Sequence, residues 1–207
     1  MLKGIHSRTP IVQPALLDAI QQRYACRKFV AERPVSLGEL ALLLEAGRLA
    51  PSAFGLEPWR FITVTDRTER AAIAHACLDQ PAAATAAAFI VIVALVAALD
   101  PDSVYVRKQF KAEARDGDPA PIHDAYRVFH RAESITEWAK GQCNFAAAQM
   151  LLQATHLELG SCPIGGFDAA TLSAALRLPA GEPPALVIAL GRCAHAAPQR
   201  LRKAFPQ

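Results

Sequence analysis

The segment Ala82–Leu99 constrains this chain strongly, because its composition allows two very different structures. It has 18 residues with Thr85 as the only polar interruption, which is the nominal length of a membrane-spanning helix. Its first half is rich in alanine, however, and residues 89–93 (FIVIV) form its strongly apolar, largely β-branched part. This pattern is typical of a short helix end followed by a strand buried on both faces, and we favour it over membrane insertion.

Hydrophobic periodicity predicts the other elements around this strand. A second fully apolar strand is expected at residues 185–190, ended by Gly191, and a third at 61–64. Ser36 and Glu39 have the spacing of a capping box that begins one of the helices. Helices are expected at 14–22, 37–50, 68–78, 125–134, 135–159 and 169–176, the last capped by Asp168. The order is not a regular βαβ alternation, which predicts an α+β sheet with helices packed around it.

Two segments carry further expectations. Residues 100–124 are rich in proline and charge and form the most loop-like part of the chain, a predicted mobile flap or insertion, although 104–114 also fits a helix. The helix at 135–159, with Gly160 expected at its C′ position, is apolar on nearly all sides. Such a helix must be covered all round, which favours a subunit interface, with a central helix of a monomer as the alternative.

Composition excludes several classes of protein. The 207 residues are 52% hydrophobic, which suits one domain spanning 1–207, and a net charge of +3 gives no argument for nucleic-acid binding. The five cysteines are widely spaced without a C-x-x-C, which argues against a metal site or a disulfide framework. The six histidines show no metal-ligand spacing either. With no apolar core of a signal peptide at the N-terminus, these features predict a cytoplasmic protein without metal.

The short basic stretch at residues 23–29 (RYACRKF) is the first candidate site. In an extended backbone Arg23, Ala25 and Arg27 share one side, so two guanidinium groups form a fork of the size of a phosphate. Planar guanidinium groups engage phosphate oxygens with two hydrogen bonds each. Taken alone, the stretch is more simply interpreted as a solvated basic turn.

Three separated stretches together resemble the nitroreductase family of FMN-dependent oxidoreductases. They are residues 23–29, residues 50–61 with APSA and EPWRF at their ends, and residues 163–168 (PIGGFD). The long helix with Trp138 and Gln142, and the apolar strand before a basic C-terminal tail, extend the resemblance over about residues 14–203. Their common order makes the match specific for the family, whereas it says little about the substrate.

The resemblance implies a fold and an activity. The expected fold is α+β, with a mixed, mainly antiparallel sheet surrounded by helices and a long central helix at the interface of a homodimer. Two FMN sites at that interface would accept hydride from NADH or NADPH and reduce nitroaromatics, quinones or related small molecules by a ping-pong mechanism. No dinucleotide fingerprint distinguishes NADH from NADPH. The alternatives are reductive dehalogenation or flavin fragmentation on the same fold, and a non-catalytic flavin-binding dimer.

The resemblance also implies roles for individual residues. Flavin carries the chemistry, so no catalytic side chain is expected, and a glycine backbone N–H would approach its N5 atom. Tyr126 and Phe129 are hypothetical substrate-gate residues. The implied FMN-binding residues are Arg23, Tyr24, Ala25 and Arg27 in the basic stretch, Pro51, Ser52 and Ala53 from the partner subunit, Gln80 at the ring edge, Pro163, Ile164, Gly165 and Gly166 against the ring, and Arg200 or Arg202 in the tail.

Two residues depart from the family pattern, and three others have a simpler interpretation. Ala25 stands where many members carry a hydroxyl residue, which removes a hydrogen bond worth about 0.5–1.5 kcal/mol. Gly165 stands where some members carry Glu, which opens the flank of the flavin. Trp59 and Trp138 are expected to be packing residues, and Cys162 a small buried thiol.

Overall fold

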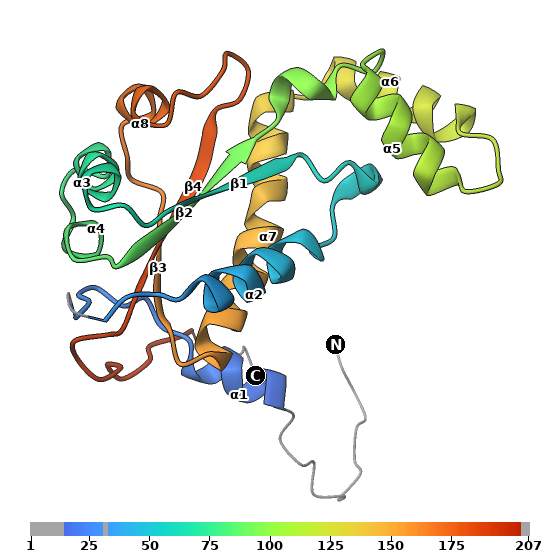
Figure 1. Cartoon of the computed structure of the whole chain (residues 1–207). Helices are drawn as coiled ribbons and strands as arrows, with labels where there is room; N and C mark the ends of the chain where they lie inside the picture. Colours follow the sequence, from blue (N-terminus) through green and yellow to red (C-terminus); the bar gives the residue numbers. More distant parts are fainter. Residues whose placement is uncertain (1–14, 31–32, 204–207) are drawn as a thin grey trace, which may run out of the picture.

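The computed structural model describes residues 15–30 and 33–203, and its four strands form one antiparallel sheet in the order β1-β2-β4-β3 (Figure 1). The strands are β1 (Trp59–Val64), β2 (Ala88–Ala94), β3 (Gly160–Ile164) and β4 (Pro184–Gly191). The helices are α1 (Ala15–Gln22), α2 (Leu37–Arg48), α3 (Arg67–Ala76), α4 (Pro81–Ala84), α5 (Val104–Ala114), α6 (Ala120–Ala132), α7 (Ile135–His156) and α8 (Ala169–Ala175), with short 3₁₀ turns η1 (Ala53–Gly55) and η2 (Val96–Leu99). The α+β class is confirmed.

Strand β2 lies in the middle of the molecule and is buried along its whole length. Alternate side chains point to opposite faces, so Ile90 and Ile92 belong to one core and Phe89 and Val91 to another. Helices α2 and α7 cover the first face, and α3, α4 and α8 cover the second (Figure 1). The predicted strand buried on both faces is therefore confirmed. Within the described ranges, no helix has the length and apolar character needed to cross a membrane.

The predicted helix starts are set by local hydrogen bonds. Ser36 Oγ accepts from the Glu39 backbone N–H at 3.2 Å, and Glu39 Oε2 accepts from the Ser36 N–H at 2.8 Å, which completes the capping box of α2. Asp168 caps α8 by accepting from the Thr171 N–H at 2.7 Å. The predicted first helix is α1, whose expected start at Pro14 lies outside the described residues, as does the expected N-terminal arm.

The end of α7 differs from the prediction. The helix ends at His156, and Glu158 rather than Gly160 takes the left-handed conformation after it, with φ of 55°. The Leu159 N–H donates to the Ala154 carbonyl oxygen at 2.8 Å, which closes a Schellman motif without glycine. Gly160 instead begins β3, which runs to Ile164 in a segment predicted to be a loop. Hydrogen bonding to β4 overrides the turn signals of this segment.

The region expected to be most loop-like is largely helical. Residues 104–114 form α5, and α6 begins at Ala120 rather than at Ala125. Ser103 caps α5 by accepting from the Val106 N–H at 3.0 Å. The sequence alone did not identify this cap because the surrounding segment is rich in proline. Nothing in the structure tests whether this region moves, so the flap stays a prediction.

Helix α7 is buried on one face only. Ala146 and Met150 are buried against the sheet and α2, whereas Phe145 is 50% exposed. The helix therefore does not close its apolar surface within one chain. The expectation that a second subunit covers it stays a prediction.

Candidate functional site

The basic stretch lies along the free edge of β3. Ala25 forms an isolated parallel bridge with Ser161, and the Cys26 N–H donates to the Ser161 carbonyl oxygen at 3.0 Å. Because side chains alternate, Arg23 and Arg27 project to the same side. The Arg27 guanidinium reaches Cys162 Sγ at 3.8 Å. Ala25 and Cys26 are thus held against the edge of the sheet.

The C-terminal tail returns to this stretch. The Arg200 guanidinium donates to the Arg23 carbonyl oxygen. Arg200 and Arg202 line a cavity of about 330 Å³ together with Arg23 and Ala25. Burial lowers the pKa of Arg23, and the positive charges of Arg200 and Arg202 lower it further. Among the described residues no carboxylate lines this cavity, so the arrangement of cations suits an anion.

The glycine-containing loop after β3 offers its backbone to solvent. Gln80 Nε2 donates to the Gly166 carbonyl oxygen at 2.6 Å, which joins a residue before α4 to this loop. Gly165 and Gly166 are exposed, and a Cβ built on Gly165 meets no atom within 4 Å. Pro163 and Ile164 belong to β3 and lead directly into this open surface. A planar ligand can therefore approach the backbone of the two glycines closely.

The predicted partner segment 51–53 lies away from these groups within one chain. Ser52 Oγ accepts from the Glu57 N–H at 2.8 Å, and the Ala53 N–H donates to Gln142 Oε1 at 2.9 Å. The segment with Pro51 follows the C-terminal end of α2, whereas the start of α2 lies near the basic stretch (Figure 1). A helix of 12 residues separates the two ends by about 18 Å. One chain alone does not bring segment 51–53 to the arginines.

The hypothetical gate residues have different positions. Tyr126 is fully buried, its hydroxyl donates to the Leu99 carbonyl oxygen at 2.7 Å, and burial raises its pKa to about 12. This buried position is that of a packing residue, and a gating role for Tyr126 stays a prediction. Phe129 is partly exposed and packs on Phe54 and Trp138 at ring-centroid distances of 5.3 Å and 5.4 Å. Its role as a gate stays a prediction.

The structure joins Cys26 and Cys193 in a disulfide, with their Cα atoms 5.9 Å apart. The argument against disulfides from the cysteine pattern is therefore wrong for this pair, and that pattern no longer supports a reducing compartment. The two residues are 167 positions apart, so no spacing signal in the sequence revealed them. Cys77, Cys143 and Cys162 are free and buried, as expected for Cys162.

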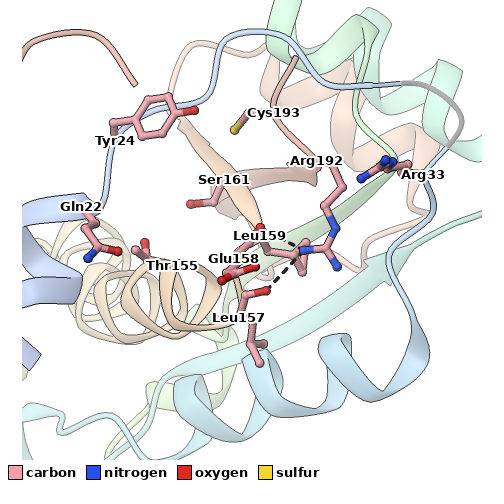
Figure 2. Close-up of a pocket in the computed structure, with 11 residues that line it drawn as sticks. Gln22, Tyr24, Arg33, Thr155, Leu157, Glu158, Leu159, Ser161, Arg192 and Cys193 are labelled. Atoms are coloured by element: carbon pink, nitrogen blue, oxygen red, sulfur yellow. Dashed lines mark hydrogen bonds between the residues drawn. The ribbon is translucent and has the colours of Figure 1, made fainter. Parts of the chain in front are cut away.

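A second cavity, of about 670 Å³, lies beside this disulfide (Figure 2). Tyr24 lines it, and the Tyr24 hydroxyl donates to the His195 carbonyl oxygen at 3.0 Å. Arg192 projects along its wall and donates to the carbonyl oxygens of Leu157 and Glu158 at 3.3 Å and 2.9 Å. Sequence patterns did not identify Arg192 as the donor to these carbonyl oxygens. In the described part of the chain, no group of three or more His, Cys, Asp or Glu is placed to hold a metal ion.

Comparison with known proteins agrees with these features. The sequence matches the model of the nitroreductase family over residues 20–192. A "putative NAD(P)H nitroreductase" of Staphylococcus saprophyticus is 30% identical over 166 residues, which cover 76% of each chain. A protein of the same printed name from Staphylococcus haemolyticus is also 30% identical, over 168 residues and 76% of each chain.

Solved structures share the fold. A nitroreductase-like protein of Streptococcus mutans superimposes with a TM-score of 0.81 at 20% identity, covering 91% of this chain and 93% of that one. A "putative nitroreductase in complex with FMN" from Exiguobacterium sibiricum gives a TM-score of 0.76 at 19% identity, covering 92% and 94%. At these identities the likeness establishes the architecture, whereas the function needs a separate argument.

Proposed function

Because this chain belongs to the nitroreductase family, we propose that it is an NAD(P)H-dependent oxidoreductase that uses FMN to reduce nitroaromatic, quinone or related acceptors. The observation that carries the proposal is the gathering of Arg23, Arg200 and Arg202 around one cavity beside the edge of the sheet. Burial lowers the pKa of Arg23, and repulsion from Arg200 and Arg202 lowers it further. A doubly charged phosphate bound in the cavity would offset this repulsion. The FMN-bound relative in the same fold supports this choice of anion.

The residues present fit FMN at both of its ends. Arg23 and Arg27 project from one side of the stretch and would hold the phosphate and ribityl chain, with the tail arginines beside them. Gly165 and Gly166 leave their backbone open where an isoalloxazine ring needs close approach. Gln80 is anchored to Gly166 and would mark the ring edge. Ala25 offers no hydroxyl, so the arginines carry the phosphate contact alone on that side of the stretch.

FMN, when bound, supplies hydride transfer from the nicotinamide and onward to the acceptor. The chain supplies position and charge. The backbone N–H groups of the loop at 165–166 would donate toward the reacting edge of the ring. The two substrates would use the same open face in turn, which gives ping-pong kinetics. Initial rates at several acceptor concentrations are then expected to give parallel double-reciprocal lines.

We also propose that the chain acts as a homodimer. Segment 51–53 lies about 18 Å, the length of α2, from the arginines of its own chain. A partner subunit is therefore needed to bring Pro51, Ser52 and Ala53 to the flavin. The apolar surface available for this contact includes Phe145, Leu42 and Leu49, which are 50–61% exposed on α7, on α2 and just after α2. Light scattering is expected to give twice the mass of 22.2 kDa.

The test of the flavin proposal is an absorption spectrum of the protein before and after anaerobic NADH or NADPH. Flavin bands that bleach support the oxidoreductase, whereas bands that persist indicate another reductant or another flavin reaction. Arg23→Ala and Arg27→Ala are expected to lose most of the bound FMN. Lys28→Ala is the matched control, because Lys28 is an exposed neighbouring cation that alternates to the other side. Unchanged FMN content in the arginine variants contradicts the phosphate site.

A further inference from the structure

Cys193 of the Cys26–Cys193 pair lines the 670 Å³ cavity, whose lining shares only Tyr24 with the residues assigned to FMN (Figure 2). We propose that this pair is a thiol–disulfide exchange site, at which a low-molecular-weight thiol enters through the cavity and attacks Cys193. The exchange itself is independent of FMN. Its expected effect on FMN affinity rests on the proposed function.

The backbone holds the two cysteines together whether or not they are bonded. Phe29 and Cys193 form an antiparallel bridge. The Val30 N–H donates to the Arg192 carbonyl oxygen at 2.8 Å, and the Ala194 N–H donates to the Lys28 carbonyl oxygen at 2.9 Å. The Cα separation of 5.9 Å lies within the range in which a disulfide forms. Opening the bond therefore leaves both thiols in place for closure.

Gly160, the first residue of β3, provides the space that the two sulfur atoms occupy. A Cβ built on Gly160 would overlap Cys193 Sγ and come within 3.1 Å of Cys26 Sγ. It would also lie 3.0 Å from the Gly191 carbonyl oxygen, so the backbone leaves no alternative place for it. The absence of a side chain at position 160 thus makes room for the Cys26–Cys193 pair.

The two sulfur atoms differ in access. Cys26 is 2% exposed, whereas Cys193 is partly exposed and lines the cavity. Arg33, which is exposed, and Arg192 line the same cavity (Figure 2), and Arg192 is ion-paired with Glu39. Because Glu158 also lines the cavity, its wall carries no excess of positive charge, and access alone decides which sulfur atom is attacked. Attack is therefore expected at Cys193, with Cys26 as the leaving group.

The exchange balances in two steps. A thiolate RS⁻ attacks Cys193 Sγ, forms RS–S–Cys193 and releases the Cys26 thiolate, which takes a proton from solvent. The Cys26 S–H then has an acceptor in the Lys28 carbonyl oxygen, 3.3 Å away. A second thiolate attacks the outer sulfur of the mixed disulfide, forms RSSR and releases the Cys193 thiolate, which is protonated. The net reaction converts the protein disulfide and two RSH into the protein dithiol and RSSR, and it is reversible.

The bond connects two parts of the anion site. Cys26 lies between Ala25 and Arg27, and Cys193 begins the segment that leads to Arg200 and Arg202. Reduction leaves only the backbone hydrogen bonds between residues 28–30 and 192–194 to tie these parts together, so the tail beyond residue 194 is held less tightly. We expect FMN affinity to fall about two- to tenfold, the effect of ordering one arginine side chain again on binding.

The first experiment uses the full chain with glutathione disulfide and glutathione as probes. After oxidation, alkylation of the denatured protein is expected to label the three free cysteines, and after reduction all five. Cys26→Ser is expected to accumulate one glutathionyl group on Cys193, and Cys193→Ser to accumulate none on the buried Cys26. Cys162→Ser is the control. Labelling of all five after oxidation, or equal adducts on the two variants, overturns the proposal.

Peptide mapping of the wild-type chain, quenched during reduction, keeps the test valid if a variant fails to fold. The mixed disulfide is expected on Cys193, and its appearance on Cys26 overturns the proposed direction of attack. FMN titration of both redox forms completes the test. Binding to neither form contradicts the proposed function and leaves the exchange result intact. Equal affinity of the two forms contradicts the tie between the disulfide and the anion site.

Discussion

The two ends of α7 lie in regions held together by different forces. Its N-terminal end joins an aromatic cluster in which Tyr126 packs on Phe54 and Phe110 at centroid distances of 5.3 Å and 5.5 Å. Its C-terminal end is held by Arg192, which donates to the last carbonyl oxygens and to the Glu39 carboxylate at 2.5 Å. One end is stabilised by apolar burial, and the other by charged hydrogen bonds.

This difference separates a region that is complete by itself from one that the proposed ligand would complete. The aromatic cluster satisfies its buried hydroxyl internally, through the Leu99 carbonyl oxygen. Near the other end, Arg23 lies beside Arg200 and Arg202, and their like charges oppose one another until an anion arrives. Stability should therefore depend on packing at one end and on solution conditions at the other.

The largest expected effect is on the aromatic end. Tyr126→Ala removes a fully buried ring and should lower the free energy of unfolding by about 3–5 kcal/mol. Tyr126→Phe, the matched control, loses the bond to Leu99 and should cost about 0.5–1.5 kcal/mol. Urea unfolding measures both. If FMN affinity falls in Tyr126→Phe while stability does not, Tyr126 is part of the binding site and the separation of the two ends fails.

The next effect is expected from ligand at the cationic end. FMN at 100 times its dissociation constant should raise the free energy of unfolding by about 2.7 kcal/mol through mass action. Arg23→Ala should lose most of this increment while its ligand-free stability stays close to that of the wild type, because repulsion from Arg200 and Arg202 is removed with the guanidinium. Thermal unfolding with and without FMN measures this, with Lys28→Ala as control. An equal increment in Arg23→Ala contradicts the anion site.

A third variant tests whether the C-terminal end of α7 depends on charged hydrogen bonds. Arg192→Met keeps much of the apolar stem but leaves the Glu39 carboxylate and the Leu157 and Glu158 carbonyl oxygens without this donor. Loss of a bond to a charged group should lower the free energy of unfolding by about 1.5–3 kcal/mol. Arg48→Met, which breaks an exposed pair with Glu45, is the control and should have a much smaller effect. Equal losses of stability in Arg192→Met and Arg48→Met would show that burial of the Arg192–Glu39 pair contributes nothing.

Local patterns predicted much of the fold. A continuous apolar, β-branched run identified β2, and Ser36 and Asp168 identified the side-chain caps of α2 and α8. Strand β3 was missed because its glycine and proline are turn residues, and pairing with β4 outweighs that preference. The missing side chain of Gly160 leaves room for two sulfur atoms. Nothing in the neighbouring sequence distinguishes this role from that of a glycine that ends a helix.

The candidate site likewise contains some features that neighbouring residues predict and others that depend on the whole fold. The extended stretch placed Arg23 and Arg27 on one side from its sequence alone, because that geometry depends on neighbouring residues. The contact between Arg23 and the tail, and the pairing of Cys26 with Cys193, join residues more than 160 positions apart. Such contacts depend on the whole fold, so only the resemblance to a family pointed to the tail and nothing pointed to the disulfide.

The smallest expected effect concerns pH at the C-terminal end of α7. Burial opposes ionisation of Glu39, but hydrogen bonds from Ser36 and the charge of Arg192 outweigh it and hold the pKa of Glu39 below its ordinary value. The unfolded chain therefore binds this proton more readily than the folded chain. The stabilisation is complete above the unfolded pKa of about 4.3 and is lost as the pH falls through the lower folded pKa.

Other carboxylates titrate in the same window, so the effect of Glu39 must be isolated as a difference between chains. Urea unfolding of the wild type and Glu39→Gln at about pH 6 and about pH 3 should show a gap that narrows in acid by no more than about 1 kcal/mol. Glu45→Gln, whose partner Arg48 is exposed, is the control and should show a smaller change. In Arg192→Met the Glu39 gap should narrow less, because the positive charge that lowers the pKa is gone. A gap that widens in acid would mean that Glu39 is stabilised in its protonated form, and that the contact with Arg192 does not hold this end of the molecule as a charged pair.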